Sequence, residues 1–178
     1  MDLQMMIAQG VGFIGMALGL SAFQCKETKK LFFVQGLASV VCALQYFLLG
    51  AYTGVLLNIA GAIRLVILYF GKKKWASHPV TVAAVTGMMV LCGIITWNGW
   101  HSILPTLAQA LSTPLYFKKN GKLLRLGQLC FMSPCWLIYN IVSRSIPGII
   151  LEILNISSVV ISLIRFKGKL GPEEEAHA

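Results

Sequence analysis

The sequence predicts an all-α membrane protein with seven transmembrane helices, arranged as two parallel three-helix repeats joined by a linker helix (3+1+3). Composition is the first reason. Of the 178 residues, 57% are hydrophobic and 12% are charged, and the mean hydropathy is +0.75. A soluble domain carries about 25% charged residues, and half that share leaves too little polar surface to cover a globule. A soluble domain, a disordered chain and a disulfide scaffold are therefore excluded.

The second reason is a series of apolar stretches, each near the ~20 residues that a helix needs to cross a bilayer. Seven can be marked, at residues 3–23, 31–49, 51–70, 79–96, 101–117, 126–142 and 146–166. The first stretch has neither a basic segment before it nor a small-residue cleavage site, so we expect a retained span and not a signal peptide. Glycine and proline, which favour turns, separate the second stretch from the third and the sixth from the seventh. Each of these two pairs is expected to form a hairpin.

The third reason is the distribution of basic residues, which follow the first, third, fifth and seventh stretches. Thirteen lie in these places: Lys26, Lys29, Lys30, Lys72, Lys73, Lys74, Lys118, Lys119, Lys122, Arg125, Arg165, Lys167 and Lys169. The other connections hold only Arg144. The positive-inside rule then places the N-terminus outside and the C-terminus in the cytoplasm. This bias and the short polar tail are typical of a bacterial inner-membrane protein, and an organelle membrane is the alternative. We expect one transmembrane domain at 1–167 and a cytoplasmic tail at 168–178.

Neither a cofactor nor a catalytic site is expected. The five cysteines form no C-x-x-C pair, and the three histidines are scattered, so no metal-ligand spacing is present. The motifs of nucleotide-binding loops, serine hydrolases and zinc proteases are also absent from the sequence. The net charge of +9 lies in short loops, where anionic lipid headgroups account for it. Nucleic acid is therefore not an expected partner.

The halves of the chain resemble each other. Residues 17–29 (ALGLSAFQCKETK) align with residues 110–122 (ALSTPLYFKKNGK) at an offset of 93, and an offset of 94 pairs Ser39 with Ser133, Gly54 with Gly148 and Leu57 with Leu151. We expect repeat one at about 3–70, the linker helix at about 79–96 and repeat two at about 101–166. An odd linker makes the two repeats parallel, a plan that transporters use with a site near the midplane between the halves.

Several motifs of the chain stand out: YFLLGAYTG at 46–54, AIR at 62–64, CWLIYN at 135–140, SIPG at 145–148, Glu152 and IR at 164–165. With these motifs the chain resembles the bacterial inner-membrane YgjV family over about residues 3–167. That family looks distantly similar to the SWEET, PQ-loop and PnuC-type transporters, so the resemblance implies a 3+1+3 bundle without implying a substrate. The chain departs from the PQ-loop pattern, because Leu115 follows Pro114 and the first stretch has Ser21-Ala22. No tryptophan lies on the third or seventh stretch, which argues against a sugar site of the SWEET type.

Polar residues inside the apolar stretches are the candidate site. Glu152 lies about six residues, or ~9 Å, from the outer end of the seventh stretch, and its short side chain snorkels poorly. Asn155 and Ser158 are expected on the same face of this helix as Glu152. Asn58 in the first repeat is the counterpart of Glu152 at the offset of 94. These residues either line a cavity between the repeats or make hydrogen bonds between packed helices, which contribute only about 0.6–2 kcal/mol each.

Arg64 is the second charged residue inside a stretch, and two interpretations of it remain. It snorkels to the inner interface, or it faces an anion or forms part of a gate. A direct ion pair with Glu152 is disfavoured, because the two residues differ in depth by about 9–12 Å on the helix rise. Further candidates for the lining are Trp136 and Asn140 on the sixth stretch. Polar positions on the second and fifth stretches could complete it: Gln35, Ser39, Cys42, Tyr46, Gln109, Ser112, Thr113 and Tyr116. Each of these fits helix packing equally well.

The leading functional hypothesis is a small-solute transporter or facilitator, in which a protonatable Glu152 couples transport to protons. The alternative is a non-transporting membrane protein that acts as an assembly or regulatory partner. An enzyme acting on lipid is disfavoured because the sequence shows no nucleophile–base pair or metal cluster. The expected partners are the lipid bilayer, an unidentified small solute and, as an open question, a second copy of the chain in a homo-oligomer.

Overall fold

A computed structural model describes residues 3–22, 25, 27–71, 75–76, 78–118, 123 and 126–165, without the side chains of residues 28 and 162–165. Within these ranges the chain is helical. The long elements are α1 (Leu3–Ala22), α2 (Thr28–Leu48), α3 (Tyr52–Tyr69), α4 (Pro79–Ile95), α5 (Ile103–Phe117), α7 (Ser133–Val142) and α8 (Ile146–Arg165). Two short elements are η1, a 3₁₀ turn at Trp100–Ser102, and η2, a π-helical segment at Gln128–Met132.

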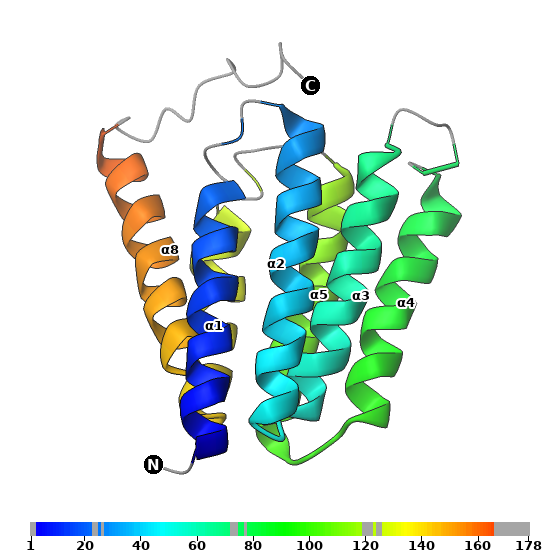
Figure 1. The fold of residues 1–178 in the computed structure, drawn as a ribbon. Coiled ribbons are helices and arrows are strands. Elements are labelled where there is room, and N and C mark those ends of the chain that lie inside the picture. Colours follow the sequence, from blue (N-terminus) through cyan, green and yellow to red (C-terminus); the bar gives the residue numbers. More distant parts are fainter. Residues whose placement is uncertain are drawn as a thin grey trace.

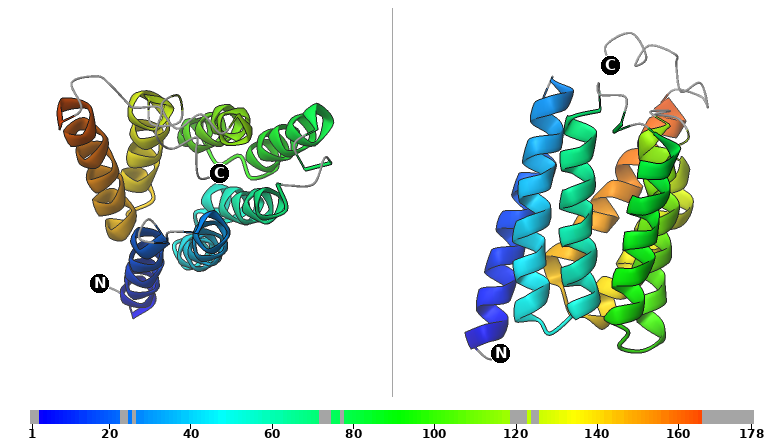
Figure 2. Two further views of the ribbon diagram at one scale, coloured as in Figure 1. Left: turned by 90° about the horizontal axis from the view of Figure 1, so that it is seen from above. Right: turned by 90° about the vertical axis from the view of Figure 1, so that its right-hand side faces the viewer.

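The helices stand side by side and alternate in direction, so that α1 begins at the lower end and α8 finishes at the upper end (Figure 1). Seen along the bundle, they form two rows, one of α1, α2 and α3 and the other of α8, α7, α5 and α4 (Figure 2). Helices adjacent in the chain are in contact, and contacts of α1 with α8 and of α3 with α5 join the two rows. Helix α4 is at one end of its row and packs on α3 and α5.

Two helical hairpins carry the same turn. In the first, the Ala51 N–H donates to the Tyr46 carbonyl at 2.9 Å, and Gly50 has φ +70°. In the second, the Ser145 N–H donates to the Asn140 carbonyl at 2.9 Å, and Arg144 has φ +55°. In both turns, a residue with a left-handed backbone is followed by an N–H that donates to the carbonyl five residues earlier. This arrangement is a Schellman motif. Glycine adopts that backbone without a Cβ penalty, whereas arginine does not.

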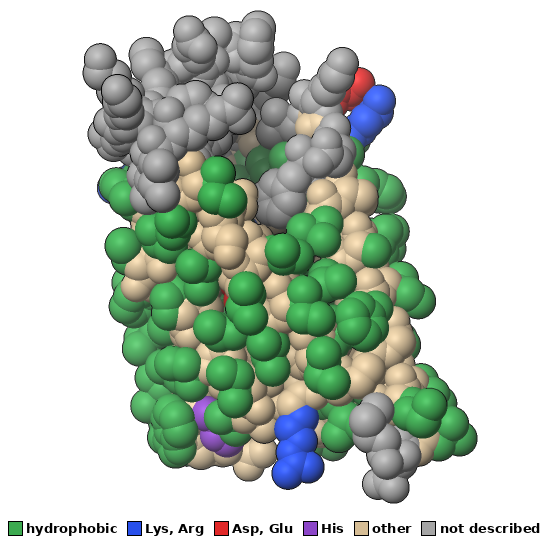
Figure 3. All heavy atoms as spheres, turned by 90° about the vertical axis from the view of Figure 1, so that its left-hand side faces the viewer, with side chains coloured by type: hydrophobic (Ala, Val, Ile, Leu, Met, Phe, Trp, Pro, Cys, Tyr) green, Lys and Arg blue, Asp and Glu red, His purple; other side chains and the backbone are tan. Residues whose placement is uncertain are grey.

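Apolar side chains cover the outside of the bundle. Phe33, Phe47, Val66, Ile94 and Ile161 are each more than half exposed, and hydrophobic atoms spread over most of the face formed by α1 and α8 (Figure 3). Each of the seven long helices presents large apolar side chains on the outside. This is the pattern of a surface that faces lipid, since soluble monomers rarely expose contiguous apolar patches of more than a few hundred Å². By length and composition, three of the described helices can cross a membrane: Leu3–Ala22, Lys29–Leu48 and Tyr52–Tyr69. The helices at Pro79–Ile95, Gln128–Val142 and Ile146–Ile161 are apolar but shorter.

The all-helical class and the positions of the seven stretches agree with the sequence prediction. The sixth stretch differs in detail, because it begins with the π-helical turn at Gln128–Met132, where the Gln128 amide donates to the Ser133 hydroxyl at 2.9 Å. Most of the basic residues on which the predicted orientation rests lie outside the described residues: Lys26, Lys72, Lys73, Lys74, Lys119, Lys122, Arg125, the side chain of Arg165, Lys167 and Lys169.

Candidate functional site

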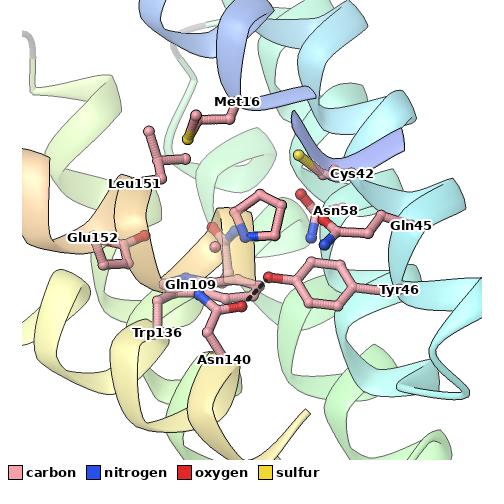
Figure 4. A pocket seen from close by; sticks show the side chains of 13 residues that line it. Met16, Cys42, Gln45, Tyr46, Asn58, Gln109, Trp136, Asn140, Leu151 and Glu152 are labelled. Atoms are coloured by element: carbon pink, nitrogen blue, oxygen red, sulfur yellow. Dashed lines mark hydrogen bonds between the residues drawn. The ribbon is translucent and has the colours of Figure 1, made fainter. Parts of the chain in front are cut away.

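A cavity of about 130 Å³ lies between the two rows of helices (Figure 4). Every long helix except α4 contributes to its wall. The lining residues are Gly12, Met16, Cys42, Gln45, Tyr46, Asn58, Gln109, Trp136, Asn140, Pro147, Gly148, Leu151 and Glu152. The cavity is nearer to the bundle end that carries the two hairpin turns, since Tyr46 and Asn140 come just before those turns and Gly148 just after one of them.

Glu152 is the charged residue in this wall. Its side chain is 8% exposed, and the Asn155 amide donates to Oε2 at 3.4 Å, which is long for a hydrogen bond. The Ser133 hydroxyl on α7 lies near the same carboxyl and accepts a hydrogen bond from the Gln128 amide at 2.9 Å. Among the described residues the ion pair found is Lys30–Glu27 at the surface, so none includes Glu152. The buried carboxyl therefore has one long hydrogen bond from a neutral donor and no basic partner in the described part of the chain.

Tyr46 and Asn140 connect the two rows across the cavity. The Tyr46 hydroxyl donates to Asn140 Oδ1 at 2.6 Å, and Figure 4 shows the two side chains meeting there. The Tyr46 ring also lies 6.0 Å from Trp136 and 5.9 Å from Tyr139, centroid to centroid. A glycine packs against each of the two bonded residues, Gly54 against Tyr46 and Gly148 against Asn140. A Cβ at Gly148 would overlap the Asn140 side chain. Small residues at these points let the helices approach closely.

A layer of further hydrogen bonds joins the rows at the hairpin end. Tyr139 on α7 accepts from the Gly54 N–H at 2.8 Å and donates to the Ala51 carbonyl at 3.3 Å. In the opposite direction, Gln45 on α2 donates to the Ser145 hydroxyl at 2.8 Å. Beneath it, Gln9 on α1 donates to the Arg144 carbonyl at 2.7 Å and accepts from the Ile146 N–H at 3.1 Å. Backbone groups that the helix starts leave unpaired are thus satisfied by side chains from the other row.

A second hollow of about 240 Å³ lies beyond this layer, at the hairpin end of the bundle. Loop and helix-end residues line it, among them Gly50, Thr53, His101 and Ser143, together with Tyr139. The rings of Tyr139, Tyr46 and Trp136 are mutually within 6.0 Å. These three rings therefore stand between the two hollows. This second hollow has no acidic residue in its lining.

Arg64 is buried, with 5% of its side chain exposed, but it lies apart from the cavity wall. Its Nη1 donates to the Ser112 and Thr113 hydroxyls on α5, at 3.0 and 3.1 Å, and the guanidinium lies 4.4 Å from the centre of the Tyr116 ring. Its Nε–H has no hydrogen-bond partner among the residues that the structure describes. Arg64 therefore turns inward onto α5, without an ion pair to Glu152 and without snorkelling into water.

A model of a bacterial inner membrane protein family, Imp-YgjV, matches residues 6–169. The chain belongs to this family. A curated relative, the inner membrane protein YgjV of Escherichia coli (strain K12), is 29% identical over 163 residues, which cover 90% of this chain and 84% of that protein. No solved structure matches the chain. Membership of Imp-YgjV identifies the chain as a bacterial inner membrane protein and confirms the family that its motifs resemble.

In this Imp-YgjV protein, four of the predicted site residues line the cavity: Glu152, Asn58, Trp136 and Asn140. Asn155 reaches it through its bond to Glu152. Ser158 is exposed on the outside of α8. Ser158 lies six residues after Glu152. At 100° per residue it therefore points about 120° away from Glu152 around the helix axis, which accounts for its exposure. Within the described residues, His, Cys, Asp and Glu side chains do not gather into a group that could hold a metal.

Sequence reasoning did not single out Gln45 or Gln9. Both reach turns 100 or more residues away along the chain. These partners depend on how the two rows pack, so the periodicity of the residue's own helix gives no signal for them. A side-chain amide without a hydrogen bond is costly in hydrocarbon, so each glutamine in a span is expected to have a partner. The sequence does not identify that partner.

Proposed function

We propose that this protein carries a small solute across the inner membrane, with the solute held in the cavity beside Glu152. In this proposal the chain crosses the membrane seven times, with its N-terminus outside and its C-terminus in the cytoplasm. The observation that carries it is the cavity itself: six helices from both rows surround a polar space with a buried carboxyl in its wall. An acidic residue at membrane depth is costly and belongs by default to a solute or ion pathway.

The contacts of the two hairpins support two parallel repeats as the framework of this carrier. An offset of 94 relates the left-handed residues Gly50 and Arg144, and it also relates the bonded pair Tyr46 and Asn140 to each other. Two hydrogen bonds between the rows are related in the same way: Gln45 donates to Ser145, and Tyr139 donates to Ala51. Position 139 is the counterpart of 45, and position 145 is the counterpart of 51. A pseudo-twofold axis along the bundle would exchange the rows in this way, with α4 as the linker outside both triplets.

A route through the protein follows from the two hollows. The second hollow lies at the end where the hairpin turns are, which the charge pattern predicts to be outside. The layer of Tyr46, Tyr139 and Trp136 separates it from the cavity. Rocking of one row against the other would break the Tyr46–Asn140 bond and join the two spaces, which is alternating access around a fixed site.

A non-transporting role as an assembly or regulatory partner is the second candidate. What favours it is that several lining groups already have partners within the protein: Asn58 Nδ2 donates to the Gly54 carbonyl at 2.8 Å, and Asn140 accepts from Tyr46. Neither candidate includes a catalytic role, a cofactor or a nucleic-acid partner, and a homo-oligomer is compatible with both.

The test is an untargeted comparison of metabolite uptake between bacterial cells with and without the protein. Cells that produce Glu152→Leu serve as the inactive comparison, and Leu44→Ala, at a 52% exposed position on α2, serves as the matched control for membrane insertion. The proposal expects at least one metabolite whose uptake needs the wild-type chain, survives Leu44→Ala and is lost in Glu152→Leu. Identical profiles in all four strains, at equal protein levels in the membrane, would reject transport and support the second candidate.

A further inference from the structure

We infer that the cavity selects a small organic cation, with an ammonium or guanidinium-like group placed against Glu152. This inference rests on the proposed function and deepens it by naming the chemical class of the solute. Three features of the cavity carry it: the charge of its wall, the hydrogen-bonding groups that remain free there, and its aromatic rings and size.

The charge of the wall has one sign. Glu152 is the acidic residue in the lining, and among the described residues no lysine, arginine or histidine lines the cavity. Arg64, the buried cation on α3, is committed to the Ser112 and Thr113 hydroxyls and the Tyr116 ring. From the described residues the carboxyl receives the long bond from Asn155. A buried carboxylate without a counter-charge is unfavourable, so an entering cation supplies what the wall lacks and an entering anion is repelled.

The free hydrogen-bonding groups favour a donor-rich solute. Asn58 uses one of its two amide N–H groups on the Gly54 carbonyl, and Gln45 uses one of its own on the Ser145 hydroxyl. The side-chain oxygens of both residues remain to accept hydrogen bonds, together with the carboxylate of Glu152. Ammonium and guanidinium groups only donate, so these three oxygen-bearing groups match them.

The aromatic rings and the volume limit the shape of the solute. Tyr46 and Trp136 lie 6.0 Å apart with their planes inclined by 36°, and both line the cavity. Ring faces attract cations, tryptophan most strongly. A volume of about 130 Å³ holds roughly four water molecules at ~30 Å³ each. The solute therefore has only a few non-hydrogen atoms in the state that the structure describes.

The test uses three probes of equal size and different charge: guanidinium, urea and acetate, each with four non-hydrogen atoms. The purified full-length protein is reconstituted in liposomes, and uptake of labelled guanidinium is measured in the presence of unlabelled guanidinium, urea or acetate. We expect saturable uptake at least tenfold above protein-free liposomes, blocked by excess guanidinium and not by urea or acetate. Glu152→Gln, which preserves the shape of the side chain, should lower it at least tenfold, whereas Leu44→Ala should leave it unchanged.

Binding is measured separately, because a slow carrier could bind without visible flux. Trp136 is made the sole tryptophan by Trp75→Phe, Trp97→Phe and Trp100→Phe, and its fluorescence is titrated with the same three probes in detergent. A response to guanidinium that depends on Glu152 supports the inference. A response to urea or acetate instead, or one that Glu152→Gln leaves intact, overturns it and leaves the proposed carrier function standing. If none of the three probes binds or is taken up, the inference is also wrong, and the uptake comparison in cells then decides the proposed function independently.

Discussion

Replacing Gly148 by alanine tests the close contact of α8 with α7 that positions Asn140 at the cavity. A Cβ at this position would overlap the Asn140 side-chain carbonyl and lie 2.7 Å from the Ser145 hydroxyl oxygen. Both neighbours are fixed, because Asn140 accepts from Tyr46 and Ser145 accepts from Gln45. The added methyl group must therefore displace a bonded side chain or move α8 away from α7.

The expected loss of stability follows from these contacts. Overpacking a close-packed site costs about 1–3 kcal/mol, to which a weakened hydrogen bond between the rows would add up to about 1 kcal/mol. For a chain of this length, 1 kcal/mol corresponds to about 2–4 °C in the unfolding midpoint. Gly148→Ala should therefore lower the midpoint by about 2–16 °C, measured in detergent as the fraction of protein that stays monodisperse after heating.

Gly87→Ala is the matched control, since no atom lies within 4 Å of a Cβ at this position on α4. Alanine is the better helix former by about 1 kcal/mol, so this variant should be neutral or more stable. If Gly148→Ala proves as stable as Gly87→Ala, the close packing of α8 on Asn140 is wrong, and with it the geometry of the cavity wall.

Three further predictions concern other parts of the bundle. Arg64→Met should keep or raise the unfolding midpoint, because it removes a buried charge with an unpaired Nε–H and the two hydroxyls retain their bonds to the Gln109 carbonyl at 3.0 and 2.8 Å; a loss of more than 5 °C would mean that the guanidinium's contacts with Ser112, Thr113 and Tyr116 stabilise the bundle by more than its burial costs. Gly50→Ala should lower the midpoint by about 2–4 °C, since alanine at φ +70° costs about 1 kcal/mol, whereas Arg144→Gly should not lower it; equal effects would refute the shared turn. Topology reporters should read inside, outside and inside, and an outside signal at the last position would reject the seven-span map. The fusion points are Lys74, Trp100 and Lys122.

The fold was largely predictable because the membrane simplifies the rules. Hydrocarbon requires the backbone to bond within each span, so apolar length alone placed the helices; the first, predicted at 3–23, is observed at Leu3–Ala22. The π-helical turn at Gln128–Met132 was not predictable, since one extra residue in a turn leaves the apolar pattern nearly unchanged. The turn residue Arg144 was also unexpected, because an arginine gives no sequence signal for a left-handed backbone.

The site was predictable where a charge was involved and less so elsewhere. Glu152 stands out in any apolar helix, and the offset of 94 led from it to Asn58, which lies in the same cavity. Arg64 stood out equally, yet its hydroxyl and aromatic partners on α5 keep it out of the cavity wall. The side chains of Gln45 and Tyr139 join distant turns, and such pairings depend on how the rows pack, which one sequence does not reveal.

The central claim is that water and small solutes reach the cavity between the rows, and Cys42 is a native probe inside it. In a chain whose other cysteines, Cys25, Cys92, Cys130 and Cys135, are replaced by alanine, Cys42 should react with a small water-soluble methanethiosulfonate in intact membranes. A cysteine at position 44, two residues along the same helix and facing outward, should react only with a lipid-soluble maleimide. If Cys42 behaves like position 44 and reacts with the lipid-soluble reagent alone, the polar residues around Glu152 serve helix packing and the carrier account is wrong.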